Sequence, residues 1–513
     1  MRLRRRRAAA DPGPRTLLAP SPAIGGALLR VGLVVALVYG VIAVGLGVTQ
    51  VVDAGRLTAD PLNPLRLAAM DSEARGRIVD VRGKVLAYSE GSKGTSQRRR
   101  YPVRAAAPIV GYQSLLLGTA GLERSYDRQL VGIEDLGQGG DLLRKLRADP
   151  VDPADLHLSI DLRLQRLAAQ LLGSDKGAVV AIEPSTGRIL ALVTSPTYDP
   201  DRLSNLATGR TYLAQLQADP DSPLLDRATQ GAYVPGSVFK LVTAAAGLES
   251  GAITPDTTFP GQPKQSREGF VVDGFRIKDA PRDVQLDHPL DLDEAMEVSS
   301  NVWFAHAALA TGATALERTA SKLGIGRALP FELPTVPTQL TGGDGPMDGF
   351  DDRVELASAG FGQGRVLMTP LQMALVGAAV ANGGEVIAPR LVDRLVTADG
   401  AIHPLGSESL GRAMSTGTAH AVRDAMVRAV EGPFADEFAG GAKVQGVTTA
   451  GKSGTAQLGE AAPHSWFVGF APAEDPRIVV AVVVENAGPG SRRAVPMGGR
   501  LLSAYLQRYA PKR

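Results

Sequence analysis

Strand-like segments stand at both ends of the region that runs from about residue 155 to the C-terminus, with helical segments between them. Residues 178–182 and 188–193 flank a Pro-Ser-Thr-Gly turn and predict a β-hairpin. Apolar runs at 466–470 and 477–484 predict two more strands close to the C-terminus. Strands from both ends of one region can share a sheet only if its last segments return to its first ones. We therefore expect an α+β fold, in which one antiparallel sheet closes late and helices cover it.

The composition excludes several classes of protein. The chain has 513 residues, of which 44% are hydrophobic, so it can bury a large core in two or more domains. Its formal net charge is only +2, and no basic face interleaved with aromatic residues occurs, which argues against nucleic acid as a partner. It has no cysteine, which excludes disulfides, thiol catalysis and cysteine-ligated metal, and its six histidines lack the spacing of metal ligands.

An uncharged apolar run at residues 31–52 follows an arginine-rich amino-terminal tail. As a helix this run would span about 33 Å, which matches the hydrocarbon core of a bilayer. Positive charge before the span predicts that residues 1–30 form a cytoplasmic tail and that the rest of the chain lies outside the cytoplasm. Cleavage near Asp53 is the alternative, but the run is longer than a signal-peptide core of about 7–15 residues. We expect a retained single-pass anchor in the cytoplasmic membrane.

Residues 53–150 have mixed character and are broken by polar stretches. Three consecutive arginines at 98–100 are expected to lie in a solvated loop, and contact with lipid headgroups or a partner is the alternative. Residues 148–153 contain two Asp-Pro pairs and look like a linker. We expect the boundary between two modules there.

Ser237 and Lys240 form the single Ser-x-x-Lys motif of the chain. A turn precedes Ser237, and an apolar helix predicted at 237–249 ends before Gly251. Residues three apart on a helix lie about 5–6 Å apart at Cβ, so Lys240 can take the hydroxyl proton of Ser237 if burial or a second cation makes the lysine neutral. The alternative is an ordinary helix cap beside a solvated surface lysine.

Two further motifs follow in order. Ser299 and Asn301 stand at the start of a segment of helical composition, where a hydroxyl can relay a proton and an amide can donate to a substrate carbonyl; a simple capping pair is the alternative. Lys452, Ser453, Gly454 and Thr455 precede the strands predicted near the C-terminus. A lysine with two flanking hydroxyls would hold a carboxylate, Gly454 would let a substrate backbone approach, and the Thr455 N–H could complete an oxyanion hole with that of Ser237. Lys452 is also the candidate second cation beside Lys240.

These three motifs, in this order, resemble those of the serine penicillin-recognising enzymes, and most closely the class B penicillin-binding proteins, which cross-link peptidoglycan. Segments 75–80 and 121–123 look like signatures of that class's N-terminal module. The chain is also similar to other characteristic segments of the family at residues 178–187, 362–364, 369–372 and 381–384. The resemblance covers nearly all of the chain after the apolar run. It implies a transpeptidase domain of serine β-lactamase-like fold at 155–513, preceded by a non-catalytic pedestal or dimerisation-type module at 53–150.

Carried over position by position, the resemblance implies that Ser237 is the acylated nucleophile and Lys240 its base. Ser299 and Asn301 would form the second wall, and the strand 452–455 would grip the substrate's terminal carboxylate. Two departures from the family pattern are mild, since Val234 replaces a frequent proline and Ser453 a more usual threonine. A class A β-lactamase is excluded, because no asparagine for its Glu-x-x-x-Asn loop occurs between Asn301 and Asn382. The hundred or so residues before the linker are too few for a glycosyltransferase domain.

The resemblance predicts a peptidoglycan D,D-transpeptidase that acts on stem peptides through a serine acyl-enzyme, without metal or organic cofactor. β-Lactams are expected to acylate the same serine. By analogy with the family, a membrane glycan polymerase of the division or elongation machinery would be its partner. Two alternatives stay open, namely a D,D-carboxypeptidase with the same residues and a non-catalytic β-lactam sensor or divisome scaffold. A dinucleotide-binding loop at 360–364 is rejected, because Arg365 occupies the place of the last required glycine.

Overall fold

The structure of the chain is a computed structural model. It falls into two units, residues 1–68 and residues 69–513. The described residues are 22–48, 75–91, 97–132, 153–283, 286–343 and 345–509.

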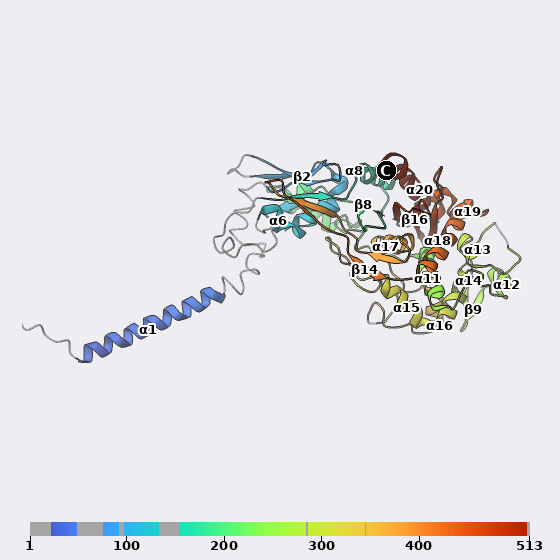
Figure 1. The fold of residues 1–513 in the computed structure, drawn as a ribbon, viewed down its shortest axis with the longest axis horizontal. Coiled ribbons are helices and arrows are strands. Elements are labelled where there is room, and N and C mark those ends of the chain that lie inside the picture. Colours follow the sequence, from blue (N-terminus) through green and yellow to red (C-terminus); the bar gives the residue numbers. More distant parts are fainter. Residues whose placement is uncertain are drawn as a thin grey trace, which may run out of the picture. The chain divides into compact units, whose positions relative to one another are not determined.

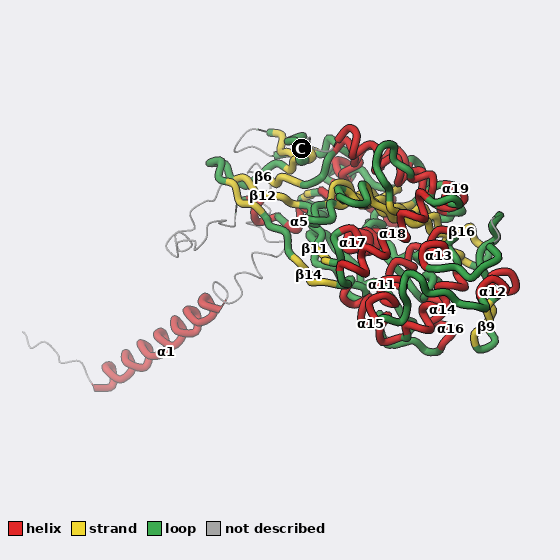
Figure 2. The backbone as a smooth tube through the Cα atoms, turned by 45° about the vertical axis from the view of Figure 1, so that its right-hand side comes forward, coloured by secondary structure: helices red, strands yellow, loops and turns green. Residues whose placement is uncertain are grey.

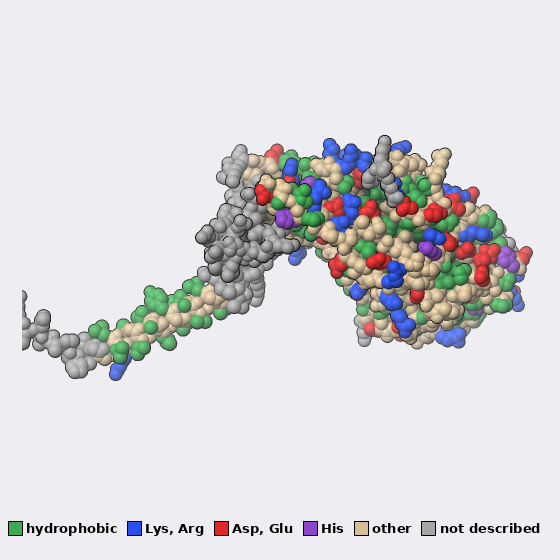
Figure 3. Space-filling view, in the orientation of Figure 1, with side chains coloured by type: hydrophobic (Ala, Val, Ile, Leu, Met, Phe, Trp, Pro, Cys, Tyr) green, Lys and Arg blue, Asp and Glu red, His purple; other side chains and the backbone are tan. Residues whose placement is uncertain are grey.

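The first unit contains one long helix, α1 (Pro22–Gly47). Its segment Gly26–Gly47 has a mean hydropathy of 2.4 and is long and apolar enough to cross a membrane. Hydrophobic side chains cover the surface of α1 in Figure 3, whereas the second unit shows charges of both signs. The helix begins earlier than the predicted run and includes Arg30. Residues 49–52 of the predicted span lie outside the described residues.

A five-stranded sheet forms the centre of the second unit. Its order is β15-β16-β17-β7-β8, and all neighbours are antiparallel. The strands are β15 (Ala450–Leu458), β16 (Ala461–Ala471), β17 (Ile478–Val484), β7 (Gly177–Ile182) and β8 (Ile189–Ser195). The predicted hairpin is β7 and β8, and the late strands close the sheet by pairing β17 with β7. The predicted α+β fold class is confirmed.

Helices cover both faces of this sheet. Figure 1 shows α8 (Leu162–Leu172) and α20 (Ala494–Ala504) on one side of the strands. On the other side lie α11 (Lys240–Ser250), α17 (Pro370–Ala381) and α18 (Thr416–Glu431). Strands β7 and β17 are buried along their whole length, as expected for strands covered on both faces.

A second group of helices packs beside α11 and carries part of the site described below (Figure 2). These helices are α12 (Gln262–Glu268), α13 (Leu292–Glu297), α14 (Asn301–Thr311), α15 (Ala313–Lys322) and α16 (Arg353–Ala359). A short hairpin adjoins them, formed by β9 (Phe270–Val272) and β10 (Phe275–Ile277). Shorter helices elsewhere in the unit are α4 (Ala107–Val110), α5 (Leu122–Ser125), α6 (Asp127–Val131), α9 (Pro200–Leu203), α10 (Gly209–Ala218) and α19 (Ala435–Phe438).

A six-stranded sheet lies in the amino-terminal part of the second unit, with the order β13-β12-β6-β1-β2-β3. Its strands are β1 (Ile78–Val79), β2 (Val85–Glu90), β3 (Arg98–Arg100), β6 (Asp155–Leu158), β12 (Val392–Val396) and β13 (Ile402–Pro404). The sheet therefore joins strands from both sides of the predicted linker. The predicted domain boundaries at 150 and 155 stay predictions. Two further pairs of short antiparallel strands are β4 (Gln113–Ser114) with β5 (Gly118–Thr119), and β11 (Glu385–Ile387) with β14 (Ser409–Arg412).

The prediction of a solvated loop at the three arginines is wrong. Arg98–Arg100 is strand β3, which pairs with β2, and Arg99 is only 3% exposed. Its guanidinium binds the fully buried carboxylate of Glu123 at 2.6 Å, and Arg75 binds the same carboxylate from the other side at 2.9 Å. Arg75 also pairs with Asp127. Strand pairing points the middle arginine inward, where Arg75 and Arg99 compensate the buried carboxylates of Glu123 and Asp127.

Candidate active site

Ser237 lies in a helical turn that runs directly into α11. Residues Gly236–Phe239 form a 3₁₀ turn, so the predicted helix is present but its first turn is tighter than expected. Gly236 has φ 56°, a conformation that suits glycine and lets the chain turn sharply before the serine. The helix ends at Gly251 with φ 73°, as predicted. Ser237 is half-buried, and within the described part of the chain its hydroxyl has no hydrogen-bond partner.

Lys240 begins α11 and is completely buried. Its ammonium nitrogen donates to Ser299 O at 2.6 Å and to Asn301 Oδ1 at 2.9 Å, and lies 3.2 Å from Ser299 Oγ. Lys240 donates in this contact, so the Asn301 amide is oriented with its oxygen toward the lysine. The amide nitrogen of Asn301 donates in turn to Lys278 O at 3.0 Å. The first and second motifs therefore meet, as the sequence predicts.

Lys452 brings the third motif to the same hydroxyl. This lysine lies on β15, is fully buried, and its Nζ lies 2.9 Å from Ser299 Oγ and 3.1 Å from Ser453 O. The hydroxyl of Ser299 is therefore in contact with two buried amines. Its backbone is at φ 56°, which is strained for a residue with a side chain and is found mainly where surrounding contacts impose it.

The two lysines have displaced pKa values. Burial lowers the pKa of Lys240 well below its ordinary value, the nearby charge of Lys452 lowers it further, and Asp279 partly opposes this. Burial lowers the pKa of Lys452 to about 7. A neutral amine is the form of lysine that can accept a proton. The alternative interpretation of Lys240 as a solvated surface lysine is wrong, because its side chain has no access to solvent.

The strand that carries Lys452 lies at the edge of the five-stranded sheet, next to the turn of Ser237. A Cβ built on Gly454 would lie 3.0 Å from Pro235 O, so only glycine allows this approach without adjustment. Ser453 is 6% exposed, whereas Thr455 is exposed and its hydroxyl accepts from Gly490 N at 3.2 Å. The ammonium of Lys452 contacts the hydroxyl of Ser299 and the carbonyl of Ser453. It contacts neither the hydroxyl of Ser453 nor that of Thr455. The assignment of Ser453, Gly454 and Thr455 to substrate binding stays a prediction.

Comparison with known proteins gives the family. Residues 177–502 match the penicillin-binding protein transpeptidase domain, and residues 75–147 match the penicillin-binding protein A dimerisation domain. The chain is 34% identical over 499 residues to a protein of Mycolicibacterium smegmatis named peptidoglycan D,D-transpeptidase PbpA, covering 94% of this chain and 99% of that one. The chain belongs to the penicillin-binding protein transpeptidase family. The resemblance of the sequence to class B penicillin-binding proteins is confirmed.

Solved structures agree with this assignment. The ceftriaxone acyl-enzyme complex of penicillin-binding protein A from M. tuberculosis superposes with a TM-score of 0.75 at 32% identity, covering 86% of this chain and 100% of that one. PBP2 of Pseudomonas aeruginosa gives a TM-score of 0.71 at 30% identity, covering 85% of this chain and 96% of that one. The fold of this penicillin-binding protein is therefore the penicillin-binding transpeptidase fold.

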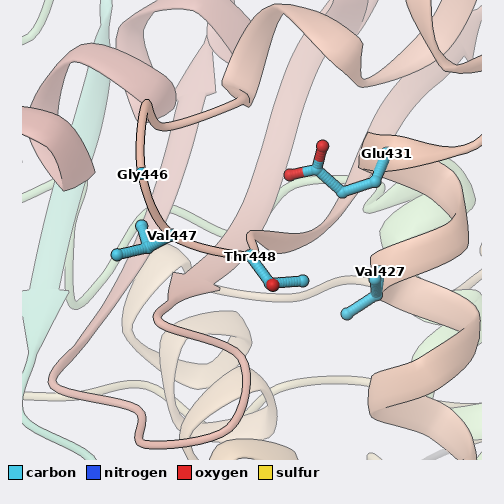
Figure 4. A pocket seen from close by; sticks show the side chains of 5 residues that line it. All are labelled: Val427, Glu431, Gly446, Val447 and Thr448. Atoms are coloured by element: carbon cyan, nitrogen blue, oxygen red, sulfur yellow. The ribbon is translucent and has the colours of Figure 1, made fainter.

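One open pocket of about 450 Å³ lies apart from these residues. It is lined by Val427, Glu431, Gly446, Val447 and Thr448, between α18 and the loop that leads into β15 (Figure 4). The Glu431 carboxylate accepts from Thr449 N at 3.2 Å, which ties the helix to this loop. The pocket shares no residue with the three motifs, and we place the chemistry at the motifs, where the buried amines converge. Among the described residues no cluster of histidine and carboxylate side chains could hold a metal ion.

Sequence reasoning missed two residues behind the second motif. Asp279 and Arg282 follow strand β10, and the Asp279 carboxylate accepts from Ser300 Oγ and from Val302 N. It also missed Trp466, whose indole N–H donates to Val234 O at 3.0 Å and anchors the turn before Ser237. That bond uses a backbone carbonyl, so it does not depend on whether residue 234 is valine or proline. No local sequence pattern marks these three residues, because their partners lie in distant segments.

Proposed function

We propose that this chain is a peptidoglycan D,D-transpeptidase in which Ser237 forms the acyl-enzyme. The observation that carries the proposal is the convergence of the amines of Lys240 and Lys452 on the hydroxyl of Ser299, since Lys240 directly follows the turn of Ser237 and that turn packs against β15, the strand of Lys452. The names of its relatives support the reaction class. The acyl-enzyme structures of M. tuberculosis penicillin-binding protein A support covalent chemistry with β-lactams.

Lys240 in its neutral form is suited to act as the base. A neutral lysine has two N–H donors and one lone pair. Its two closest contacts, Ser299 O and Asn301 Oδ1, can only accept, so they occupy both donors. The lone pair is then left for a hydroxyl proton. In this proposal Lys240 takes the proton of Ser237 while the serine oxygen attacks the penultimate D-alanine carbonyl of a stem peptide.

The remaining groups stabilise the intermediate and deliver the proton. The Ser237 N–H belongs to the first turn of a helix, where backbone donors have no intrahelical partner, and with the Thr455 N–H it would form the oxyanion hole. Ser299 would pass the proton from Lys240 to the departing D-alanine nitrogen. Lys452 with Ser453 and Thr455 would hold the terminal carboxylate, and β15, as the edge strand of the sheet, would pair with the peptide backbone.

The second half-reaction regenerates the enzyme. The amino group of a neighbouring stem peptide attacks the ester carbonyl, the Ser237 oxygen leaves and regains a proton, and an amide cross-link forms. A β-lactam enters the first half-reaction because its strained amide presents a carbonyl and a carboxylate at similar positions. Its ester then persists, because after ring opening the leaving nitrogen stays covalently attached to the acyl group and does not vacate the site for an acceptor amine.

We infer that α1 anchors the protein in the cytoplasmic membrane with the catalytic unit outside the cytoplasm. The arginine-rich tail before α1 supports this orientation. Because the chain has no cysteine, a single introduced cysteine reports its own location. We expect a membrane-impermeant maleimide to label Ser185→Cys in intact cells and to label Ala9→Cys only after lysis. A membrane glycan polymerase of the division or elongation machinery is the proposed partner, by analogy with the family.

The direct test is acylation by a fluorescent penicillin, followed by mass measurement of the intact protein. The full chain in detergent should gain one penicillin mass, Ser237→Ala should gain none, and Ser185→Ala, which changes an exposed serine outside the motifs, should label like the parent. Labelling that survives Ser237→Ala would refute the nucleophile. Incubation with stem pentapeptides separates the reactions, since cross-linked dimers indicate a transpeptidase and free tetrapeptide alone indicates a carboxypeptidase.

A further inference from the structure

The segment that follows β10 forms hydrogen bonds to the region of the second motif, Ser299–Asn301. The side chain of Asp279 is only 4% exposed, although it carries a carboxylate. It accepts hydrogen bonds from Ser300 Oγ at 3.1 Å and from Val302 N at 2.9 Å. One residue earlier, the carbonyl of Lys278 accepts from the Asn301 amide at 3.0 Å. Two consecutive residues of this segment therefore hold three consecutive residues of the motif region.

Asp279 supplies the charge that a helix start requires. Ser300 is the N-cap of α14, and its hydroxyl accepts from Trp303 N while donating to Asp279. The Val302 N–H is one of the first-turn donors that lack an intrahelical partner, and the Asp279 carboxylate satisfies it. Negative charge at a helix N-terminus is stabilising, here in a buried site. The carboxylate thus fixes the start of α14, from which Ser299 and Asn301 reach Lys240.

The charge of Asp279 is balanced by Arg282, which lies 3.3 Å from it in a nearly buried pair. The charged groups that face Lys240 are therefore Lys452 from β15, and Asp279 and Arg282 from the segment after β10. Lys452 and Arg282 oppose the protonation of Lys240, and Asp279 favours it. The centre of the aromatic ring of Phe304, on α14, lies 5.4 Å from Lys240 Nζ.

We propose that Asp279 is a positioning residue of the transpeptidase site, which holds the Ser299–Asn301 wall in place from the start of α14 and, with Arg282 as its counter-charge, sets the electrostatic surroundings of Lys240. The inference rests on the proposed function. Asp279 itself does not contact the substrate. Its action passes through Ser300 and the backbone of α14 to Ser299 and Asn301.

Three variants separate positioning from charge, measured as the rate of acylation by fluorescent penicillin between pH 5 and 9 with the full chain in detergent. Asp279→Ala loses both the hydrogen bonds and the charge, so its rate should fall roughly ten- to a hundredfold, the range that small misplacements of reacting groups produce. Asp279→Asn keeps an acceptor for Val302 N and should recover most of that rate. It lacks the anion that raises the pKa of Lys240, so the acidic limb of its pH profile should move to lower pH.

Arg282→Gln should move the acidic limb in the opposite direction. Removing this cation raises the pKa of Lys240, so a higher pH is needed to make the lysine neutral. Asp199→Asn is the control, because the Asp199 carboxylate also accepts from backbone N–H groups at the start of a helix, the distant α9, and its replacement should leave both the rate and the acidic limb unchanged. The Asn and Gln variants keep the test decisive if Asp279→Ala does not fold.

A rate loss with no movement of the limb in Asp279→Asn and Arg282→Gln would overturn the electrostatic role, and parental rates in all three variants would overturn the whole inference. These failures differ from failure of the proposed function. In that case the parent itself, or Ser237→Ala, would behave contrary to expectation, and this inference would fall with it.

Discussion

Lys452 Nζ lies 2.9 Å from Ser299 Oγ, although the two residues are 153 positions apart in the chain. The same hydroxyl lies 3.2 Å from Lys240 Nζ. One hydroxyl therefore connects two buried amines, and a proton gained by either amine affects the other through charge repulsion across a site with little solvent.

This relationship predicts a change in the pH dependence of acylation. Lys452 lowers the pKa of Lys240, so Lys452→Met should raise it. A smaller fraction of Lys240 is then neutral at a given pH, and the acidic limb of the acylation profile should move to higher pH. Fluorescent penicillin labelling at a series of pH values measures this shift. An acidic limb at the same pH as in the parent protein would show that Lys452 acts on the substrate carboxylate alone.

The displaced pKa of Lys452 also predicts how stability depends on pH. Its folded value is about 7, below the value of about 10.4 for an unfolded chain, so the unfolded chain binds more protons between these limits. The free energy of unfolding should therefore rise with pH from about 7 to about 10, by at most about 1.4 kcal/mol per pH unit for this lysine. Thermal unfolding in detergent should show a weaker rise for Lys452→Met. Lys176→Met, which changes an exposed lysine, should keep the parental rise.

Strand β3 offers a matched pair of arginines for a test of the buried ion pair. Arg99→Met leaves Glu123 with one cation fewer inside the protein, and we expect a loss of about 3 kcal/mol in the free energy of unfolding. Arg98→Met changes the neighbouring exposed arginine and should alter stability by less than about 0.5 kcal/mol. Thermal unfolding of both variants checks this. Equal effects at the two positions would contradict the burial of Arg99.

The turn before the nucleophile should not tolerate a side chain. A Cβ on Gly236 would lie 2.8 Å from Thr455 O, and the residue has φ 56°. Gly236→Ala should therefore displace Ser237 from β15 and slow acylation roughly tenfold or more. Gly251→Ala shares the unfavourable φ, at 73°, but a Cβ there meets open space. It should cost about 1–2 kcal/mol of stability and leave acylation unchanged.

Much of the fold could be predicted from local patterns. The hairpin of β7 and β8 and the late strands β16 and β17 follow from apolar runs bounded by turn residues. Lys452 lies on β15, as expected for a segment before those strands. The family, the fold class and the reaction class are confirmed. The roles of the individual site residues stay proposals, which the experiments above test.

The sequence by itself determined which chemical groups are present, in which order, and on which kind of element each begins. Periodicity and turn residues are local, so they can be recognised without knowing the path of the chain. Only the tertiary structure decided which polar groups are buried together. Three consecutive arginines carry no periodic signal, yet strand pairing places Arg99 on Glu123. Asp279 reaches Ser300 and Lys452 reaches Ser299 only because distant segments pack side by side, and the burial that this packing causes is what displaces the pKa values of the two lysines.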